Sequence, residues 1–227
     1  MAEPLAYEST GYEVVEEEPP ELLGRNLRAG AYLFAGGTAF FFLCFLFAFF
    51  YLRSLDNAGL WKPKGVDASV AWGTVIVALY VASALLVRLG LADHVAGRRR
   101  QWRQKGAAAL AAGVAGLVVQ VIGWSHQGFG PADGGFASVY FGWTAFLFLF
   151  VFGTMYWLET TLATSLRYRK QATGSPEPGH ASGDPDRTAH DIHDPLSLVR
   201  PQLEALSFYW MFLAGIAVLA WVLLYLV

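Results

Sequence analysis

The sequence predicts an all-α membrane protein, a polytopic bundle of five transmembrane helices, and three observations support this fold class. First, 55% of the 227 residues are hydrophobic, and the mean hydropathy is +0.40. Second, only 15% of the residues are charged, against about 25% in soluble domains, and they gather between long apolar blocks. Third, the blocks lack the alternation of barrel strands, so helices are left to close the backbone hydrogen bonds in lipid.

The first apolar block runs from Gly30 to Arg53 and shows the pattern that the others repeat. Its uncharged part, residues 31–52, is longer than the about 20 residues that a helix needs to cross a bilayer. The block ends in aromatic residues and an arginine, which is typical of a membrane interface. Four similar blocks follow, and the spans are expected at residues 30–52, 69–92, 106–125, 136–163 and 204–227.

The segments outside the spans are polar. Residues 1–28 are acidic and cannot bury enough apolar surface to fold alone. We interpret them as a solvated tail, and a docking strip for a partner is the alternative. This acidic N-terminus also predicts that no cleavable signal peptide is present. Residues 167–203 are rich in Pro, Gly, Ser, Asp and His and are predicted to form a flexible linker.

The basic residues predict how the chain is oriented in the membrane. Lys and Arg gather in the tail, in the second connection and in the fourth: Arg25, Arg28, Arg98, Arg99, Arg100, Arg103, Lys105, Arg167, Arg169, Lys170, Arg187 and Arg200. The other side carries only Arg53, Lys62 and Lys64. Because cytoplasmic loops are enriched in Lys and Arg, we expect a bacterial plasma-membrane protein with its N-terminus in the cytoplasm and its C-terminus outside.

Two features of the spans predict how the helices pack. The third span is rich in Ala and Gly, and small residues let helices approach closely in lipid, so we place this span in the interior of the bundle. The uncharged polar residues within the spans are expected to form hydrogen bonds within or between helices. They are Thr38, Cys44, Thr74, Ser83, Gln120, Thr144 and Thr154.

The charged residues of the spans are the first candidates for function, because charges in lipid are costly without a partner. Arg88 and Glu159 lie in the same half of the membrane by the predicted topology, and a salt bridge between them is one interpretation. The alternative is that both side chains reach separately to the interface. Glu204 opens the last span, where a carboxylate favours the helix N-terminus.

No catalytic, cofactor-binding or metal-binding constellation is apparent in the sequence. The single cysteine, Cys44, excludes an internal disulfide and a cysteine-built metal site. Haem ligation needs histidines that project from span interiors, and none of the five histidines lies in mid-span. Phosphate loops, nucleophile elbows and zinc motifs are also missing. A small bundle of this kind is most often a subunit of a larger complex.

The order of several motifs resembles subunit III of haem-copper oxidases in its five-helix form, which lacks the first two helices of the seven-helix form. The first span and the connection after it carry the clearest match, at Gly30, Tyr32, Phe34, Arg53, Trp61 and Pro63. Weaker matches follow in the later spans, at Gln120, Trp124, Thr144, Glu204, Tyr209 and Trp210.

The chain departs from the family pattern at its polar landmarks. Thr38 replaces the usual glutamate of the first span, and Leu147 and Phe150 replace two histidines of the penultimate helix. Met211 and Ala214 stand where the last helix usually has histidine and aspartate. The apolar scaffold is therefore what the chain shares with the family.

The resemblance implies a divergent, non-catalytic subunit of a bacterial terminal oxidase, which reduces O2 to water in aerobic respiration. It implies subunits I and II as partners, with haem and copper held there, and bound phospholipid in this chain. Cytochrome c or quinol would be the electron donor, and cytochrome c is the commoner. Nucleic acid is not expected as a partner. The alternatives are an accessory subunit of a nitric oxide reductase, a subunit of another respiratory complex, and a small transporter.

Overall fold

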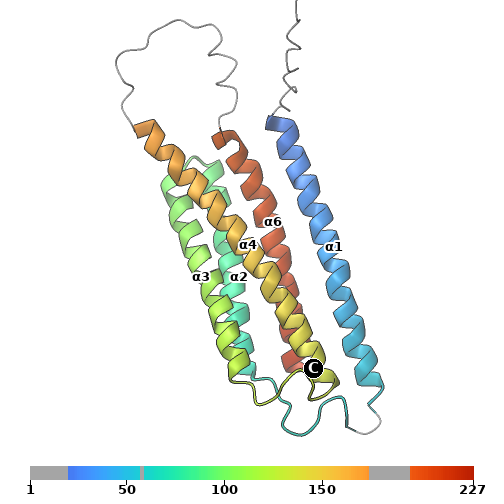
Figure 1. The fold of residues 1–227 in the computed structure, drawn as a ribbon. Coiled ribbons are helices and arrows are strands. Elements are labelled where there is room, and N and C mark those ends of the chain that lie inside the picture. The colour runs from blue at the N-terminus through green and yellow to red at the C-terminus, as the bar shows by residue number, and fades with distance from the viewer. Residues whose placement is uncertain (1–19, 57–58, 174–194) are drawn as a thin grey trace, which may run out of the picture.

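The computed structural model describes residues 20–56, 59–173 and 195–227, and within these ranges the chain forms helices and no strand. The all-α prediction is confirmed. The elements are α1 (Pro20–Ser54), α2 (Val70–Val95), α3 (Arg99–Ser125), α4 (Gly135–Thr173), α6 (Pro195–Trp221) and a final π-helical turn, η1 (Val222–Leu226). Figure 1 shows the five long helices running alongside one another.

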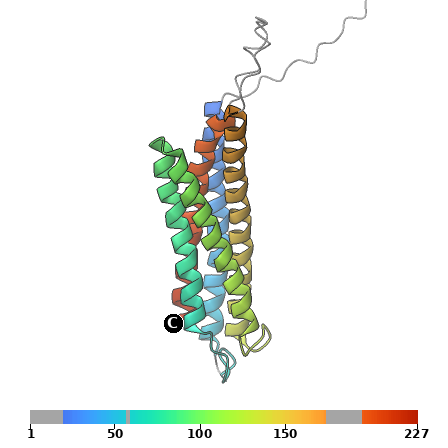
Figure 2. The ribbon, with the colours of Figure 1, turned by 90° about the vertical axis from the view of Figure 1, so that its left-hand side faces the viewer.

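Each of the five long helices is long and apolar enough to cross a membrane, so the chain is a multi-pass membrane protein. Successive helices run in opposite directions, so each helix begins at the end of the bundle where the preceding helix ends (Figures 1 and 2). We call the end where α1, α3 and α6 begin the basic end, after Arg28, Arg98, Arg99, Arg100, Arg103, Lys105 and Arg200. The opposite end, with residues 55–56, 59–69 and 126–134, is the loop end.

At the basic end the helices are longer than the predicted spans. Helix α1 begins at Pro20, inside the predicted tail, while α4 reaches Thr173 and α6 begins at Pro195, inside the predicted linker. The apolar pattern stops at the first charges, whereas helical hydrogen bonding continues past them. Proline suits the first position of a helix because its nitrogen has no hydrogen to leave unpaired. The remainder of the tail and linker, residues 1–19 and 174–194, lies outside the described residues.

Helix α6, the last in the sequence, occupies the centre of the bundle and packs against α1, α2 and α4. Its largest buried side chains include Leu203, Leu206, Tyr209, Trp210 and Leu213. Helix α3 instead packs against α2 and α4 and exposes one apolar face. The predicted interior position of residues 106–125 is therefore wrong.

The small residues of α3 serve close approach at the edge of the bundle. The Tyr80 ring of α2 lies against Gly116, where an added Cβ would come within 2.5 Å of ring atom Cε1. Met155 and Leu162 of α4 likewise lie against Gly113 and Gly106, with no room for an added Cβ. Glycine thus brings α3 against both neighbours, which explains the composition of this helix without an interior position.

The loop end is closed by hydrogen bonds between the first connection and the start of α4. The backbone N–H groups of Gly135 and Phe136 donate to the carbonyl oxygens of Leu60 and Trp61, at 3.2 and 2.8 Å. These two donors lie in the first turn of α4, where helix N–H groups have no partner within the helix. The Trp61 ring packs edge-on against Phe136, with ring centroids 5.8 Å apart. The first connection is therefore fixed to α4.

Candidate functional site

A buried hydrogen-bond network joins α2, α3 and α4 in the half of the bundle nearer the loop end. The Tyr80 hydroxyl donates to Gln120 Oε1 at 2.8 Å, and Gln120 Nε2 donates to the Thr144 carbonyl at 3.0 Å. Trp124 Nε1 donates to the Thr144 hydroxyl at 3.1 Å. Gln120 and Trp124 lie four residues apart and so share one face of α3. We call these four side chains the glutamine network.

Two adjacent aromatic residues connect the central helix to the rest of the bundle. Trp210 Nε1 donates to Ser83 Oγ at 3.0 Å, and Ser83 Oγ donates to the Ala109 carbonyl at 2.6 Å. The hydroxyls of Tyr209 and Thr38 share a hydrogen bond of 3.2 Å. Neighbouring residues on a helix point in directions about 100° apart. Trp210 therefore reaches α2 while Tyr209 reaches α1.

A tyrosine pair connects α4 to the end of the chain. The hydroxyls of Tyr140 and Tyr225 share a hydrogen bond of 3.0 Å, and Gln127 Nε2 donates to the Tyr140 hydroxyl at 3.0 Å. The Tyr225 ring lies over Gly73 of α2, where an added Cβ would be 2.5 Å from ring atom Cζ. A small cavity of about 30 Å³ lies beside this pair and the glutamine network.

A larger cavity, of about 220 Å³, lies at the basic end between α1, α2 and α6. We call it the basic-end cavity, and it is lined by Arg28, Ala31, Tyr32, Arg88, Leu91, Glu204, Ala205 and Phe208. The Glu204 carboxylate pairs with Arg28 Nη2 at 2.8 Å and with Arg200 Nε at 3.0 Å. Because α6 begins at Pro195, Glu204 lies beyond its first turn. The predicted interaction of this carboxylate with the helix N-terminus is therefore replaced by two ion pairs.

The structure does not bring Arg88 and Glu159 together. Arg88 lines the basic-end cavity, whereas Glu159 lines a groove between α3 and α4. Helix α2 packs on α3 and α6, which separate it from α4. No salt bridge joins the two side chains in the described part of the chain, and each lies on the outside of the bundle.

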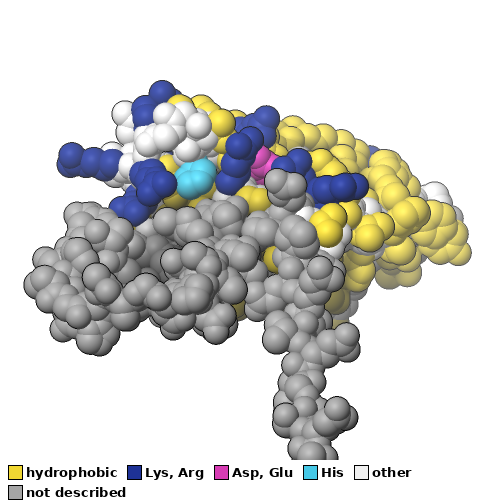
Figure 3. Space-filling view, turned by 90° about the horizontal axis from the view of Figure 1, so that it is seen from above, with side chains coloured by type: hydrophobic (Ala, Val, Ile, Leu, Met, Phe, Trp, Pro, Cys, Tyr) yellow, Lys and Arg dark blue, Asp and Glu magenta, His cyan; other side chains and the backbone are white. Residues whose placement is uncertain are grey.

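A second charged cluster at the basic end was not found from the sequence. Asp93 is buried in the last turn of α2, and its carboxylate pairs with Arg98 at 2.6 Å and Lys105 at 2.5 Å. In the sequence, Asp93 is an isolated acidic residue shortly before the basic connection of α2 and α3, and this position could have indicated an ion pair. Figure 3 shows this end of the bundle from above, with Lys and Arg side chains across its described surface. The Asp93 pairs hold the short connection between α2 and α3.

The remaining residues that match the family pattern lie mostly in aromatic contacts. Tyr32 packs edge-on against Phe208 with ring centroids 4.5 Å apart, and Phe34 lies 4.8 Å from Tyr209. The Arg53 guanidinium lies 5.9 Å from a ring centroid of the same helix. Pro63 lies against Gly134, whose φ of 134° favours glycine. Gly30 has open space where a side chain would be.

The departures from the family pattern are accommodated by apolar packing or hydrogen bonding. Thr38 makes the hydrogen bond to Tyr209 described above. Leu147 and Ala214 are buried in the core, and the Phe150 ring lies against three phenylalanine rings of α1. Met211 is exposed on α6. These positions therefore contribute surface and volume rather than charge.

The histidines that the structure describes lie at the ends of helices. His94 lies in the last turn of α2 and His126 directly follows α3, so neither projects from a span interior. Within residues 20–56, 59–173 and 195–227, no three or more His, Cys, Asp or Glu side chains are grouped so that they could hold a metal ion. His180, His190 and His193 lie outside the described residues.

The chain can now be compared with known proteins. Residues 18–174, which include α1 to α4, match the family model of cytochrome c oxidase subunit III. The chain belongs to this family. No curated protein sequence matches the chain significantly. As a member of the subunit III family, the chain carries Gln120, Trp124 and Thr144 within one network that fastens three helices together.

Proposed function

We propose that the chain is a non-catalytic, subunit III-like membrane subunit of a bacterial haem-copper terminal oxidase. Partner subunits I and II hold the haems and copper and reduce O2 to water, and this chain supports assembly, lipid packing and stability of the complex. The family match over residues 18–174 carries the proposal. The polar groups of the spans support it, because they pair with one another across helices instead of converging on a reacting atom.

The chain lies in the plasma membrane with its basic end in the cytoplasm and its C-terminus outside. The distribution of Lys and Arg supports this orientation, and the start of α1 at Pro20 and the C-terminus lie at opposite ends of the bundle (Figure 1). A reporter that is active only in the cytoplasm should be inactive when fused after Val227. Full activity at this position would contradict the orientation.

The basic-end cavity holds the headgroup of a membrane phospholipid. Arg28 and Arg88 line it together with Tyr32, and Arg88 has no ion-pair partner among the described residues. Basic pockets between helices at the cytoplasmic side suit anionic headgroups. Arg200, which pairs with Glu204, offsets the carboxylate of the cavity wall. The net charge around the cavity is therefore positive, from Arg28 and Arg88.

Purification from the native host tests the proposed function. A tag on the N-terminus, followed by gentle solubilisation, should recover a coloured complex with a haem signal in the reduced-minus-oxidised spectrum. The complex should consume O2 with cytochrome c or quinol, and this assay identifies the donor. Consumption of nitric oxide instead of O2 would assign the chain to a nitric oxide reductase. A colourless and pure preparation of this chain would contradict both, and an ion-flux assay in liposomes would then test a transporter.

A further inference from the structure

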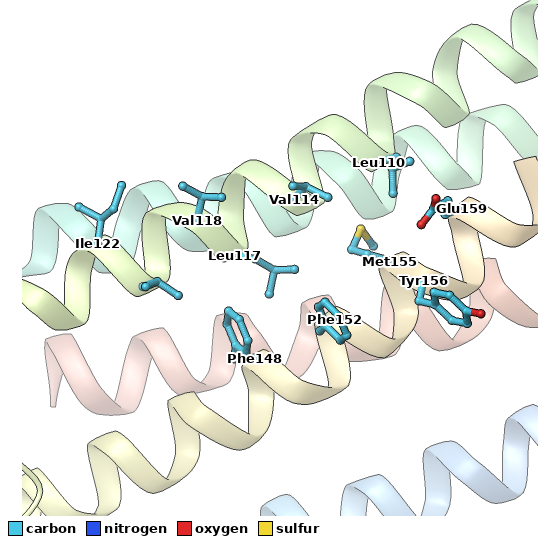
Figure 4. A pocket seen from close by; sticks show the side chains of 11 residues that line it. Leu110, Val114, Leu117, Val118, Ile122, Phe148, Phe152, Met155, Tyr156 and Glu159 are labelled. Atoms are coloured by element: carbon cyan, nitrogen blue, oxygen red, sulfur yellow. The ribbon is translucent and has the colours of Figure 1, made fainter.

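The groove between α3 and α4 lies on the outside of the bundle, away from the basic-end cavity. It has a volume of about 440 Å³, and both of its walls are apolar except at one end. The α3 wall carries Leu110, Val114, Leu117, Val118, Val121 and Ile122, and the α4 wall carries Phe148, Phe152, Met155, Tyr156 and Glu159. Figure 4 shows these two rows facing each other across the groove.

The two walls have the form of ridges that a third helix could fit. Val114, Val118 and Ile122 follow one another at intervals of four residues on α3. Phe148, Phe152 and Tyr156 do the same on α4. From Leu110 to Ile122 the groove extends for about 18 Å, or roughly three helical turns. This length suits one row of side chains from a helix that packs ridge-into-groove.

Glu159 places a carboxylate at the end of this groove nearer the basic end. Its side chain is exposed, and no hydrogen bond or salt bridge to it occurs among the described residues. Arg103 of α3 donates from Nη2 to the Ser165 carbonyl at 2.8 Å. This contact bridges α3 and α4 beyond the groove, at the basic end.

Glu159 lies within the apolar span of α4, where a carboxylate without a counter-charge is costly. The described span of α4, Gly135–Leu166, has 32 residues and is thus about 48 Å long. Glu159 lies seven residues, or about 10 Å along the helix axis, from the Leu166 end of this span and thus within the apolar segment. At that depth acyl chains supply no counter-charge, and an intramembrane carboxylate marks a functional contact.

We propose that the α3/α4 groove is the docking surface for a transmembrane helix of a partner subunit, and that this helix places a Lys or Arg side chain against Glu159. The charge complementarity fixes the chemistry of the partner, and the two apolar ridges fix its course along α3 and α4. The inference rests on the proposed function, because the partner is the haem-bearing subunit of the oxidase complex.

Site-directed photocrosslinking in the intact complex tests the docking surface. A photoreactive amino acid replaces Val118 in the groove or, as a matched control, Leu43 on the outer face of α1; both side chains are 52% exposed. We expect a crosslink from position 118 to the haem-bearing subunit and none from position 43. A crosslink from position 118 only to lipid, or to a second copy of this chain, would overturn the proposal.

Charge variants test the role of the carboxylate. Glu159→Lys should lower the haem recovered per tagged chain by roughly fivefold or more, because it sets two cations against each other, and Glu159→Gln should lower it less. Thr160→Lys places the same charge one residue away and should retain the complex. Equal losses in Glu159→Lys and Thr160→Lys would contradict a specific pair. A haem-free preparation from the unmodified chain would refute the proposed function as well, whereas a haem-containing complex without crosslinks at position 118 refutes the docking surface alone.

Discussion

The polar side chains of the spans divide into two sets that behave differently. The interior set, represented by Gln120, Ser83 and Trp210, forms hydrogen bonds from helix to helix inside the bundle. The outer set, Arg88 and Glu159, faces outward and has no ion pair among the described residues. The difference indicates that the interior set holds this chain together, while the outer set is available to molecules outside it.

The largest loss of stability is expected when a side chain is added to a glycine that an aromatic ring of the neighbouring helix contacts. In Gly116→Ala the new methyl group would overlap the Tyr80 ring, which is fully buried and hydrogen-bonded. We expect a loss of about 1 to 3 kcal/mol, as is typical of overpacking, measured as a lower Tm of the purified complex in detergent. Gly215→Ala, where nothing lies within 4 Å of the new atom, is the control and should not lower Tm. Equal Tm values for the two variants would contradict the packing between α2 and α3.

The next largest effect is expected in the glutamine network. Gln120→Leu leaves the Tyr80 hydroxyl and the Thr144 carbonyl without their shared partner. A loss of about 1 to 2 kcal/mol is expected, because unpaired buried groups are costly although hydrogen bonds in membranes are individually weak. Tyr80→Phe removes only one of the two bonds and should lower Tm less. A Gln120→Leu complex as stable as the unmodified one would show that the network does not stabilise the bundle.

A smaller effect is expected from the ion pairs of Glu204. Glu204→Gln removes the charge that pairs with Arg28 and Arg200 at the basic end. Since ion pairs near water contribute at most about 1 kcal/mol, the drop in Tm should be slight and should diminish as salt is added. A large drop that is independent of salt would instead indicate a buried structural role.

The smallest effect on stability is expected in the outer set. Arg88→Leu should leave Tm unchanged but lower the retention of anionic phospholipid about fivefold, since one basic residue at the membrane surface contributes about 1 kcal/mol. Native mass spectrometry of the complex measures the retained lipid. Arg100→Leu, a basic residue at the same end that does not line the cavity, is the matched control. Similar lipid loss in both variants would argue against a specific headgroup site.

The sequence predicted the number of spans and their approximate places because hydropathy reports how long an apolar segment is. It also pointed to Gln120 and Thr144 as helix–helix contacts, since polar groups in lipid need partners. It did not predict which helices are neighbours. The sequence placed Arg88 and Glu159 in the same half of the membrane. In the structure, however, α3 and α6 lie between their two helices. The direction in which a helix faces its neighbours depends on tertiary packing, which a single apolar pattern leaves open.

The most direct test of the account compares complexes purified from cells with and without this chain. Haem per catalytic subunit and the initial rate of O2 consumption per haem are measured in both. If the chain is a non-catalytic supporting subunit, both values are retained without it, while the Tm of the remaining complex falls. A lower amount of haem per catalytic subunit in the complex without this chain would contradict the account, because it would place a redox centre in this subunit.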